Sequence, residues 1–161
     1  TSSEQKMNTV AENTYGWAEM PLRTTLNVTI YESLSIKNYI KSVNKRYIPT
    51  YFFTAEATSS DKLWLLSCGE IWDNGYNGGQ TRGYSISTEG SQYKYYKVTL
   101  GSAAYNASTN VIQKPNSNPK SWWLRSPSYD NSYSFCMISS SGLGDYLNTL
   151  YDCGVAPGFS I

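Results

Sequence analysis

Residues 121–127 read SWWLRSP, and this stretch decides how the C-terminal part of the chain is expected to fold. Two tryptophans and a leucine in succession predict a buried strand. Pro127 is expected to end that strand, because proline cannot donate a hydrogen bond to a sheet ladder. Beside two tryptophans, Arg125 is expected to be at least half-buried and to bridge backbone carbonyls. The stretch therefore predicts scaffold residues, which are Trp122, Trp123 and Arg125.

Short strands separated by turns are expected to follow. The apolar run 135–138 predicts the next strand, and residues 139–144 form a turn rich in serine and glycine. Residues 146–150 fit a further strand or a loop, and residues 155–161 are predicted as a closing strand. The side chains expected to be mostly buried are Trp122, Leu124, Leu65, Ile138 and Val155.

The N-terminal part is predicted to be mostly helical after a loose start. Residues 1–14 are polar and are expected to be loosely held, and two helices are expected in residues 17–47. Pro21 suits the first turn of one helix. Thr29 is the expected N-cap of the other, with Glu32 three residues later. Four basic residues match the dipole at the end of this second helix and predict a solvated face, namely Lys37, Lys41, Lys45 and Arg46.

The middle of the chain is predicted to contain short strands and loops. Residues 51–53 and 62–67 fit strands, and residues 73–83 (DNGYNGGQTRG) predict a loop. A phosphate-binding role for this glycine-rich loop lacks the GxxxxGK[ST] spacing. Residues 92–100 fit a helix or a strand. The length of the chain predicts one domain, residues 1–161, of the α+β class.

The composition argues against several classes of function. Charged residues make up 16% of the 161 residues and the net charge is +1, so no basic field is available to hold a nucleic acid. The absence of histidine removes the commonest general base and metal ligand. The three cysteines, Cys68, Cys136 and Cys153, fit no zinc spacing. We expect no metal, no cofactor and no enzymatic activity. No apolar run reaches the roughly 20 residues that span a bilayer.

The composition changes after Lys120. Residues 1–120 contain lysine, glutamate and glutamine throughout, whereas residues 121–161 contain none of the three. Serine, tyrosine, aspartate, asparagine and glycine fill this segment instead. Antibody paratopes use the same residues, because tyrosine supplies rigid amphipathic area and the small polar residues supply adaptable hydrogen bonds. A region of short β loops has a similar composition. We favour a diversified binding surface over that plainer interpretation.

The genetic code strengthens this interpretation. Randomising both adenines of the asparagine codon AAC yields NNC codons. These encode tyrosine, serine, aspartate, asparagine, glycine, leucine and threonine among others, but never lysine, glutamate, glutamine, methionine or tryptophan. Trp122, Trp123 and Met137 would then be fixed positions, and the polar and tyrosine positions between them would be permitted outcomes.

Residues 121–127 (SWWLRSP) and 154–159 (GVAPGF) together resemble a bacterial domain family with a WWLRSP-type motif and a GVRPA-type closing strand. Residues 17–27 (WAEMPLRTTLN), 61–67 (DKLWLLS) with Glu70, and 90–97 (GSQYKYYK) resemble it too, so the resemblance spans most of the chain. The family is similar to C-type-lectin-like domains, and the arrangement is similar to the variable proteins of diversity-generating retroelements. The resemblance implies a C-type-lectin-like fold with two N-terminal helices, short antiparallel strands and long loops.

Two departures from the related proteins matter. Ala156 stands where the family usually has arginine, so the salt bridge expected there is missing or replaced. Sugar-binding C-type lectins hold Ca²⁺ with Glu-Pro-Asn or Gln-Pro-Asp and Trp-Asn-Asp. Residues 113–116 (QKPN) only faintly resemble the first motif, and the second is absent. A calcium site is therefore not expected.

The resemblance implies a ligand-binding domain of the receptor-recognition or adhesion type with a hypervariable C-terminal surface. Its partner would be a protein or cell-surface ligand, carbohydrate included, and its place extracellular, on a cell surface or on a phage particle. Two alternatives stay open. One is a fixed lectin-like module for carbohydrate or cell-wall material. The other is an enzyme of the formylglycine-generating type, with Cys68 and Cys136 as reactive thiols. The residues expected on the binding surface are Tyr129, Asp130, Asn131, Tyr133, Ser139, Ser141, Leu143, Asp145, Tyr146, Asn148, Thr149, Tyr151 and Asp152.

Overall fold

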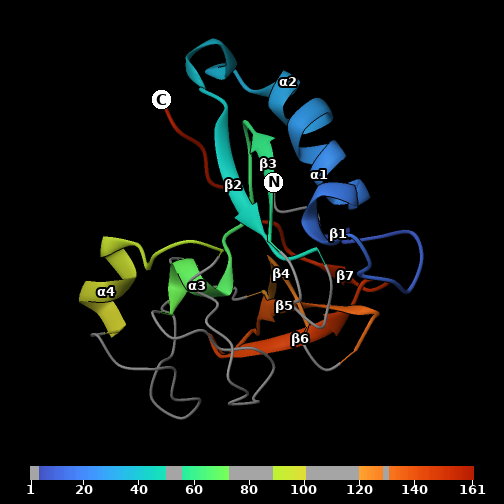
Figure 1. The fold of residues 1–161 in the computed structure, drawn as a ribbon. Coiled ribbons are helices and arrows are strands. Elements are labelled where there is room, and N and C mark those ends of the chain that lie inside the picture. The colour runs from blue at the N-terminus through green and yellow to red at the C-terminus, as the bar shows by residue number, and fades with distance from the viewer. Residues whose placement is uncertain (1–3, 50–55, 73–88, 101–119, 129–130) are drawn as a thin grey trace.

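The computed structural model describes residues 4–49, 56–72, 89–100, 120–128 and 131–161. It shows a mixed α+β chain with small antiparallel sheets and short helices (Figure 1). The elements are, in order, β1 (Gln5–Lys6), η1 (Gly16–Glu19), α1 (Pro21–Thr24), η2 (Thr25–Ile30), α2 (Tyr31–Ser33), η3 (Lys37–Tyr39), β2 (Val43–Tyr47), β3 (Ala57–Asp61), α3 (Cys68–Ile71), α4 (Lys94–Leu100), β4 (Trp122–Pro127), β5 (Ser134–Ile138), β6 (Gly144–Asn148) and β7 (Asp152–Cys153).

The described strands form three sheets, and every strand pair in them is antiparallel. The largest has the order β4-β5-β6, so β6 is an edge strand. Strands β2 and β3 form a second sheet, and β1 pairs with β7 in a third. The strands predicted at 122–125 and 135–138 are confirmed, and residues 146–150 lie partly in β6. The predicted closing strand is wrong: residues 155–161 contribute only single bridges, Trp64 to Gly158 and Lys41 to Ser160.

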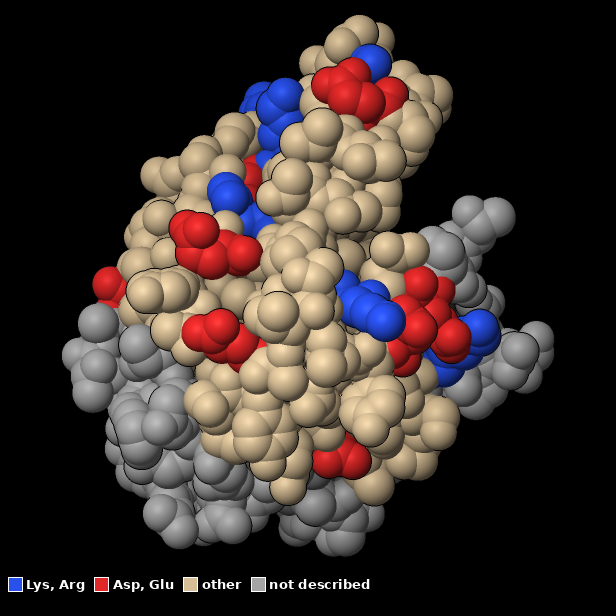
Figure 2. Space-filling view, turned by 90° about the vertical axis from the view of Figure 1, so that its right-hand side faces the viewer, with Lys and Arg blue, Asp and Glu red and all other residues tan. Residues whose placement is uncertain are grey.

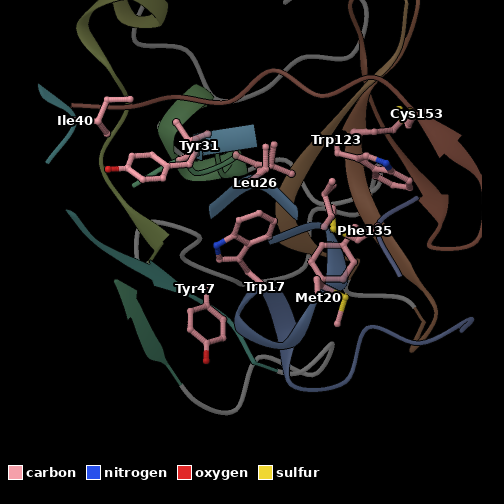
Figure 3. Close-up of a cluster of buried hydrophobic side chains, with 14 residues drawn as sticks. Trp17, Met20, Leu26, Tyr31, Ile40, Tyr47, Trp123, Phe135 and Cys153 are labelled. Carbon is pink, nitrogen blue, oxygen red and sulfur yellow. The ribbon is translucent and has the colours of Figure 1, made fainter. Parts of the chain in front are cut away.

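The three-stranded sheet is covered on both faces by apolar side chains. Along β5, Phe135 and Met137 belong to one core cluster, whereas Cys136 and Ile138 belong to a second. Successive side chains of a strand point to opposite faces, so the sheet separates the two clusters. The larger cluster also contains Trp17, which lies among side chains from the helices and the sheet (Figure 3).

The predicted core residues are only partly confirmed. Leu65, Leu124 and Ile138 are buried as predicted. Trp122 and Val155 are only partly buried, so the prediction overstated them. Residue 123 is the β4 position that faces the larger cluster, and Trp123 takes the fully buried place there.

The prediction of two N-terminal helices is wrong. Residues 21–33 form one helical run, α1–η2–α2, with a π-helical middle, and Leu34 leaves it in an extended conformation. Thr29 lies inside this run instead of capping a second helix. Residues 43–47 form β2, which pairs with β3 and in which buried and exposed side chains alternate. The apolar residues between 30 and 43 fit a 3.6-residue period, yet a helix ends and a strand begins within this range.

The N-terminal segment is not loose within residues 4–14. Met7 and Asn13 are fully buried, and β1 pairs with β7. The side chain of Asn13 donates to the carbonyl of Ser134 at 2.7 Å, and its backbone N–H donates to Ser132 O at 2.7 Å. A polar sequence is held here by hydrogen bonds to distant backbone, which composition alone does not reveal.

The middle of the chain agrees in part with the predictions. Residues 62–67 are mostly buried, but the strand lies just before them, at β3. Residues 94–100 form α4, which settles the choice between helix and strand. Helix α3 was not predicted, although Ser67 and Glu70 form a capping box at its start. Residues 51–53 and 73–83 lie outside the described residues.

Candidate functional site

The tyrosines predicted for the binding surface are exposed where the structure describes them. Tyr133 is 46% exposed just before β5, Tyr146 is 41% exposed on β6, and Tyr151 is 62% exposed in the turn after β6. Asp145 and Asp152 are exposed beside them. The β5–β6 hairpin and its flanking turns therefore carry aromatic and acidic side chains to solvent. Tyr129 and Asp130 lie outside the described residues.

Several of the small polar residues form the turns that carry these side chains. The Oδ1 atoms of Asn131 and Asn148 accept from the backbone N–H groups of Tyr133 (3.1 Å) and Leu150 (3.0 Å). These are the local side-chain bonds that favour asparagine in turns. Both asparagines are half-buried, so they are less exposed than predicted.

Serine supports the β5–β6 turn in the same way. Ser139 Oγ accepts from the backbone N–H of Leu143 at 3.2 Å and shares a 2.8 Å hydrogen bond with the hydroxyl of Ser141. Ser141 is exposed, and Ser139 and Leu143 are half-buried. Gly142, between them, has φ 86°, a left-handed conformation that favours glycine.

Thr149 contradicts the prediction that it is a surface residue. Its side chain is fully buried, and Oγ1 donates to the carbonyl of Val10 at 2.8 Å and accepts from the N–H of Glu12 at 3.2 Å. Its backbone N–H donates to Tyr133 O at 3.0 Å. Thr149 is therefore an anchor between the turn after β6 and the N-terminal segment.

Beneath this surface, Arg125 lies at the centre of a buried polar network. Its guanidinium is fully buried and donates to the carbonyls of Leu65 (2.7 Å), Glu89 (2.6 Å) and Arg46 (3.1 Å). It also donates to Glu70 Oε2 at 2.5 Å. The prediction that Arg125 bridges backbone carbonyls is confirmed. Four segments far apart in sequence are thus joined through one side chain, which has the donors to satisfy them all.

Glu70 is held between two cations. Lys45 Nζ contacts Glu70 Oε1, donates to Tyr93 Oη at 2.9 Å and lies 4.7 Å from the centre of the Trp64 ring. Lys45 is buried, so the prediction of a solvated face is wrong at this position. Burial would raise the pKa of Glu70, but the charges and hydrogen bonds of Arg125 and Lys45 outweigh it and lower the pKa below its usual range.

Glu89 is the second buried carboxyl group of the network. It accepts from the N–H of Ile48 at 3.3 Å and from Ser126 Oγ, which in turn accepts from the N–H of Cys68 at 2.9 Å. Burial raises the pKa of Glu89 to about 7, although the positive charge of Arg125 and these hydrogen bonds partly oppose the shift. No sequence pattern pointed to Glu89 or paired Lys45 with Glu70. For Glu70, the available signal was the resemblance of residues 61–67 with Glu70 to the WWLRSP-type family.

All three cysteines are buried, and each carries a thiol that is not part of a disulfide. Cys68 and Cys136 belong to the second core cluster, and Cys153 belongs to the first. A hydrogen bond with Cys68, followed by burial, raises the pKa of Cys136, which favours the protonated thiol over the reactive thiolate. Within the described ranges no three side chains of the histidine, cysteine, aspartate or glutamate type gather where they could hold a metal ion. In the same ranges no helix has the length and apolar character needed to cross a membrane.

Taken together, the described residues define an α+β domain in which a buried ionic network supports a hairpin with exposed tyrosines. The chain belongs to the family described as "Domain of unknown function (DUF6273)", which matches residues 1–161. No curated protein and no solved structure matches the chain.

Proposed function

We propose that this protein is a ligand-binding domain of C-type-lectin-like type whose C-terminal surface is diversified by a retroelement to recognise varied protein or cell-surface ligands. Its place would be outside the cell, on a cell surface or on a phage particle. The protein would act by binding, not by catalysis. The surface consists of the described exposed residues of the β5–β6 hairpin and its turns, centred on Tyr133, Tyr146 and Tyr151.

The observation that carries the proposal is a separation of two residue types along one segment. Between residues 122 and 153, the residues that NNC codons cannot encode, Trp122, Trp123 and Met137, are buried or half-buried. The exposed positions of the same segment hold residues that NNC codons do encode, such as Tyr146 and Tyr151. Variation confined to such codons would therefore change the surface and leave the supporting tryptophans intact.

The physical cost of such variation is small at these positions. Substitutions of exposed side chains usually change stability by no more than about 0.5 kcal/mol. Strand β5 of the hairpin has only buried side chains, and the neighbouring strand β4 contains the buried Arg125. A rigid base with adaptable turns is the arrangement that antibody paratopes use.

Sequencing the coding locus in many cells of one lineage tests the proposal. We expect substitutions at the codons for Tyr133, Asp145, Tyr146, Tyr151 and Asp152, none in residues 122–125, and a reverse transcriptase gene with an adenine-rich template repeat beside the locus. Thr149 was also predicted for this surface, but its buried hydrogen bonds make it unsuitable for variation, so we expect it to stay unchanged. A uniform locus without such a template would contradict diversification.

A binding measurement separates this proposal from a fixed carbohydrate module. A fixed carbohydrate module would bind one class of glycan on a glycan array. This binding would be lost when Tyr133, Tyr146 and Tyr151 are replaced by serine. A matched control replaces Val28, Ile36 and Tyr39, which are large exposed side chains of the helical part, by serine. Glycan binding that survives the tyrosine replacements but not the control set would place the binding surface elsewhere.

A further inference from the structure

The tyrosine-bearing hairpin does not stand alone, because the N-terminal segment is fastened against it at two points. Thr149 bonds to Val10 and Glu12 next to the turn that carries Tyr151. Asn13 donates to the carbonyls of Asn131 (2.9 Å) and Ser132 (2.7 Å), in the turn that carries Tyr133. Residues 10–13 therefore lie between the two turns.

This segment presents side chains of its own to solvent. Val10 is 52% exposed although it is apolar, and Glu12 is exposed. Leu150, in the anchored turn, is also exposed. The surface thus continues from the hairpin onto residues 10–12, which lie outside the segment whose composition suggests diversification. It combines apolar, aromatic and acidic side chains.

The described charged side chains of the hairpin, its turns and residues 10–12 are all acidic. After Arg125 the sequence contains no lysine and no further arginine, and its charged residues are Asp130, Asp145 and Asp152. Lys6 lies opposite Asp152 in the β1–β7 pair, and Lys120 pairs with Glu4 at 3.2 Å. Glu12 and Asp145 have no basic side chain within 4.0 Å among the described residues. Figure 2 shows a broad uncharged area on one face of the molecule, with isolated acidic residues in it and basic and acidic residues together at its edge.

A surface that carries both exposed tyrosine rings and carboxylates is suited to cations. The face of a tyrosine ring attracts lysine and arginine side chains, and a carboxylate adds a charge-assisted hydrogen bond. The same carboxylates repel the phosphates of a nucleic acid. A neutral sugar would use the rings but gain nothing from the net negative charge.

We propose that the binding surface includes residues 10–12 and that it takes a protein segment presenting lysine or arginine side chains. This inference rests on the proposed function of the hairpin and names its partner class. Val10 and Leu150 supply apolar contact, Tyr133 and Tyr151 supply ring faces, and Glu12 supplies the charge at this end. Asp145, which is exposed near the other end of β6, supplies a second carboxylate.

Selection from a phage-displayed library of random dodecapeptides against the full chain tests the inference. We expect the recovered peptides to be enriched in lysine and arginine, and their binding to weaken as salt is raised. The double variant Glu12→Gln, Asp145→Asn keeps the shape and removes both charges, and should weaken these peptides by on the order of tenfold. Glu56 is an exposed acidic residue just before β3, away from the hairpin in the sequence. The control variant Glu56→Gln should leave binding unchanged.

The outcomes distinguish this inference from the proposed function. Recovered peptides without basic enrichment, lost when Tyr133, Tyr146 and Tyr151 are replaced by serine, would overturn the partner class and leave the hairpin as the binding surface. Basic peptides that bind equally well to the tyrosine variant would overturn both. Recovery of no peptide above background would overturn the partner class. The Val10→Ser variant is expected to bind these peptides about threefold more weakly. Binding as tight as that of the natural protein would overturn the extension onto residues 10–12.

Discussion

The network around Arg125 and the turns around Tyr133 and Tyr151 both depend on polar side chains, but they use them in opposite ways. In the network, the buried guanidinium of Arg125 bonds to three backbone carbonyls and one carboxylate of distant segments. In the turns, the side chains of Asn131, Ser139 and Asn148 bond to backbone within four residues of themselves. Thr149 is the exception, because it bonds to the distant N-terminal segment. Loss of one member of the network affects distant segments, whereas loss of Asn131, Ser139 or Asn148 affects its own loop. The fold therefore separates what must stay constant from what can change.

The largest effect is expected from Arg125→Ala. The variant leaves Glu70 and three backbone carbonyls without their common donor in a buried site. Removing one partner of a buried ion pair costs about 3–5 kcal/mol of unfolding free energy. Urea denaturation followed by tryptophan fluorescence measures it. Tyr39→Ala, on the exposed surface, is the control, and a loss below about 1 kcal/mol for Arg125→Ala would show that the network does not hold the fold together.

A pH effect of somewhat smaller size is expected from Glu89. Its pKa in the folded protein is about 7, above the ordinary 4.5, so the folded state holds this proton more tightly than the unfolded state. The stability that protonated Glu89 contributes is complete below pH 4.5 and is lost as pH rises to about 7, by linkage a change of a few kcal/mol.

The variant Glu89→Gln isolates this contribution, because glutamine stays neutral. The unfolding free energy of the variant minus that of the natural protein should rise between pH 5 and pH 7 and then level off. Glu70, whose pKa is lowered, destabilises both proteins as pH falls below its ordinary value, so its effect cancels in the difference. A difference that does not change with pH would show that Glu89 is not buried as a neutral acid.

Thr149→Val should have an intermediate effect. Valine keeps the shape and removes a hydroxyl that makes two hydrogen bonds to the N-terminal segment, a loss of about 1–3 kcal/mol when buried partners are left unsatisfied. Hydrogen exchange should increase at the amide of Glu12, which loses its bond to Thr149 and keeps only the one to the carbonyl of Val10. Thr29→Val, on the exposed helical surface, controls for the substitution itself. Equal exchange at Glu12 in both variants would place Thr149 with the changeable turn residues.

The smallest effect on stability is expected from replacing the exposed tyrosines, although this change should have the largest effect on binding. Replacing Tyr133, Tyr146 and Tyr151 by serine should change the melting temperature by no more than a few degrees, because exposed substitutions cost about 0.5 kcal/mol or less each. Differential scanning calorimetry measures it. Unfolding of this variant would assign the tyrosines to the scaffold and remove the distinction between the two regions.

Particular residues show what the sequence could and could not predict. The burial of Arg125 followed from its place beside two tryptophans, and the exposure of Tyr146 and Tyr151 followed from a segment poor in aliphatic residues. The role of Thr149 could not be predicted, because its partners lie almost the whole chain away at residues 10 and 12. The sequence pattern predicts Lys45 at the end of a helix, so the burial of its side chain on β2 could not be predicted. Long-range pairing decides each of these cases, and local patterns do not contain it.

The pairing of β1 with β7 has a consequence for how the chain is made. Gln5 lies opposite Cys153, and Trp123 Nε1 donates to the carbonyl of Gln5 at 2.7 Å. During synthesis β1 therefore leaves the ribosome long before its partner β7, and contacts so distant in sequence form slowly. This pairing forms only after the whole hairpin segment has been synthesised. A nonsense codon anywhere in that segment would leave β1 without its partner strand and expose Met7, so truncated products would be open to proteolysis.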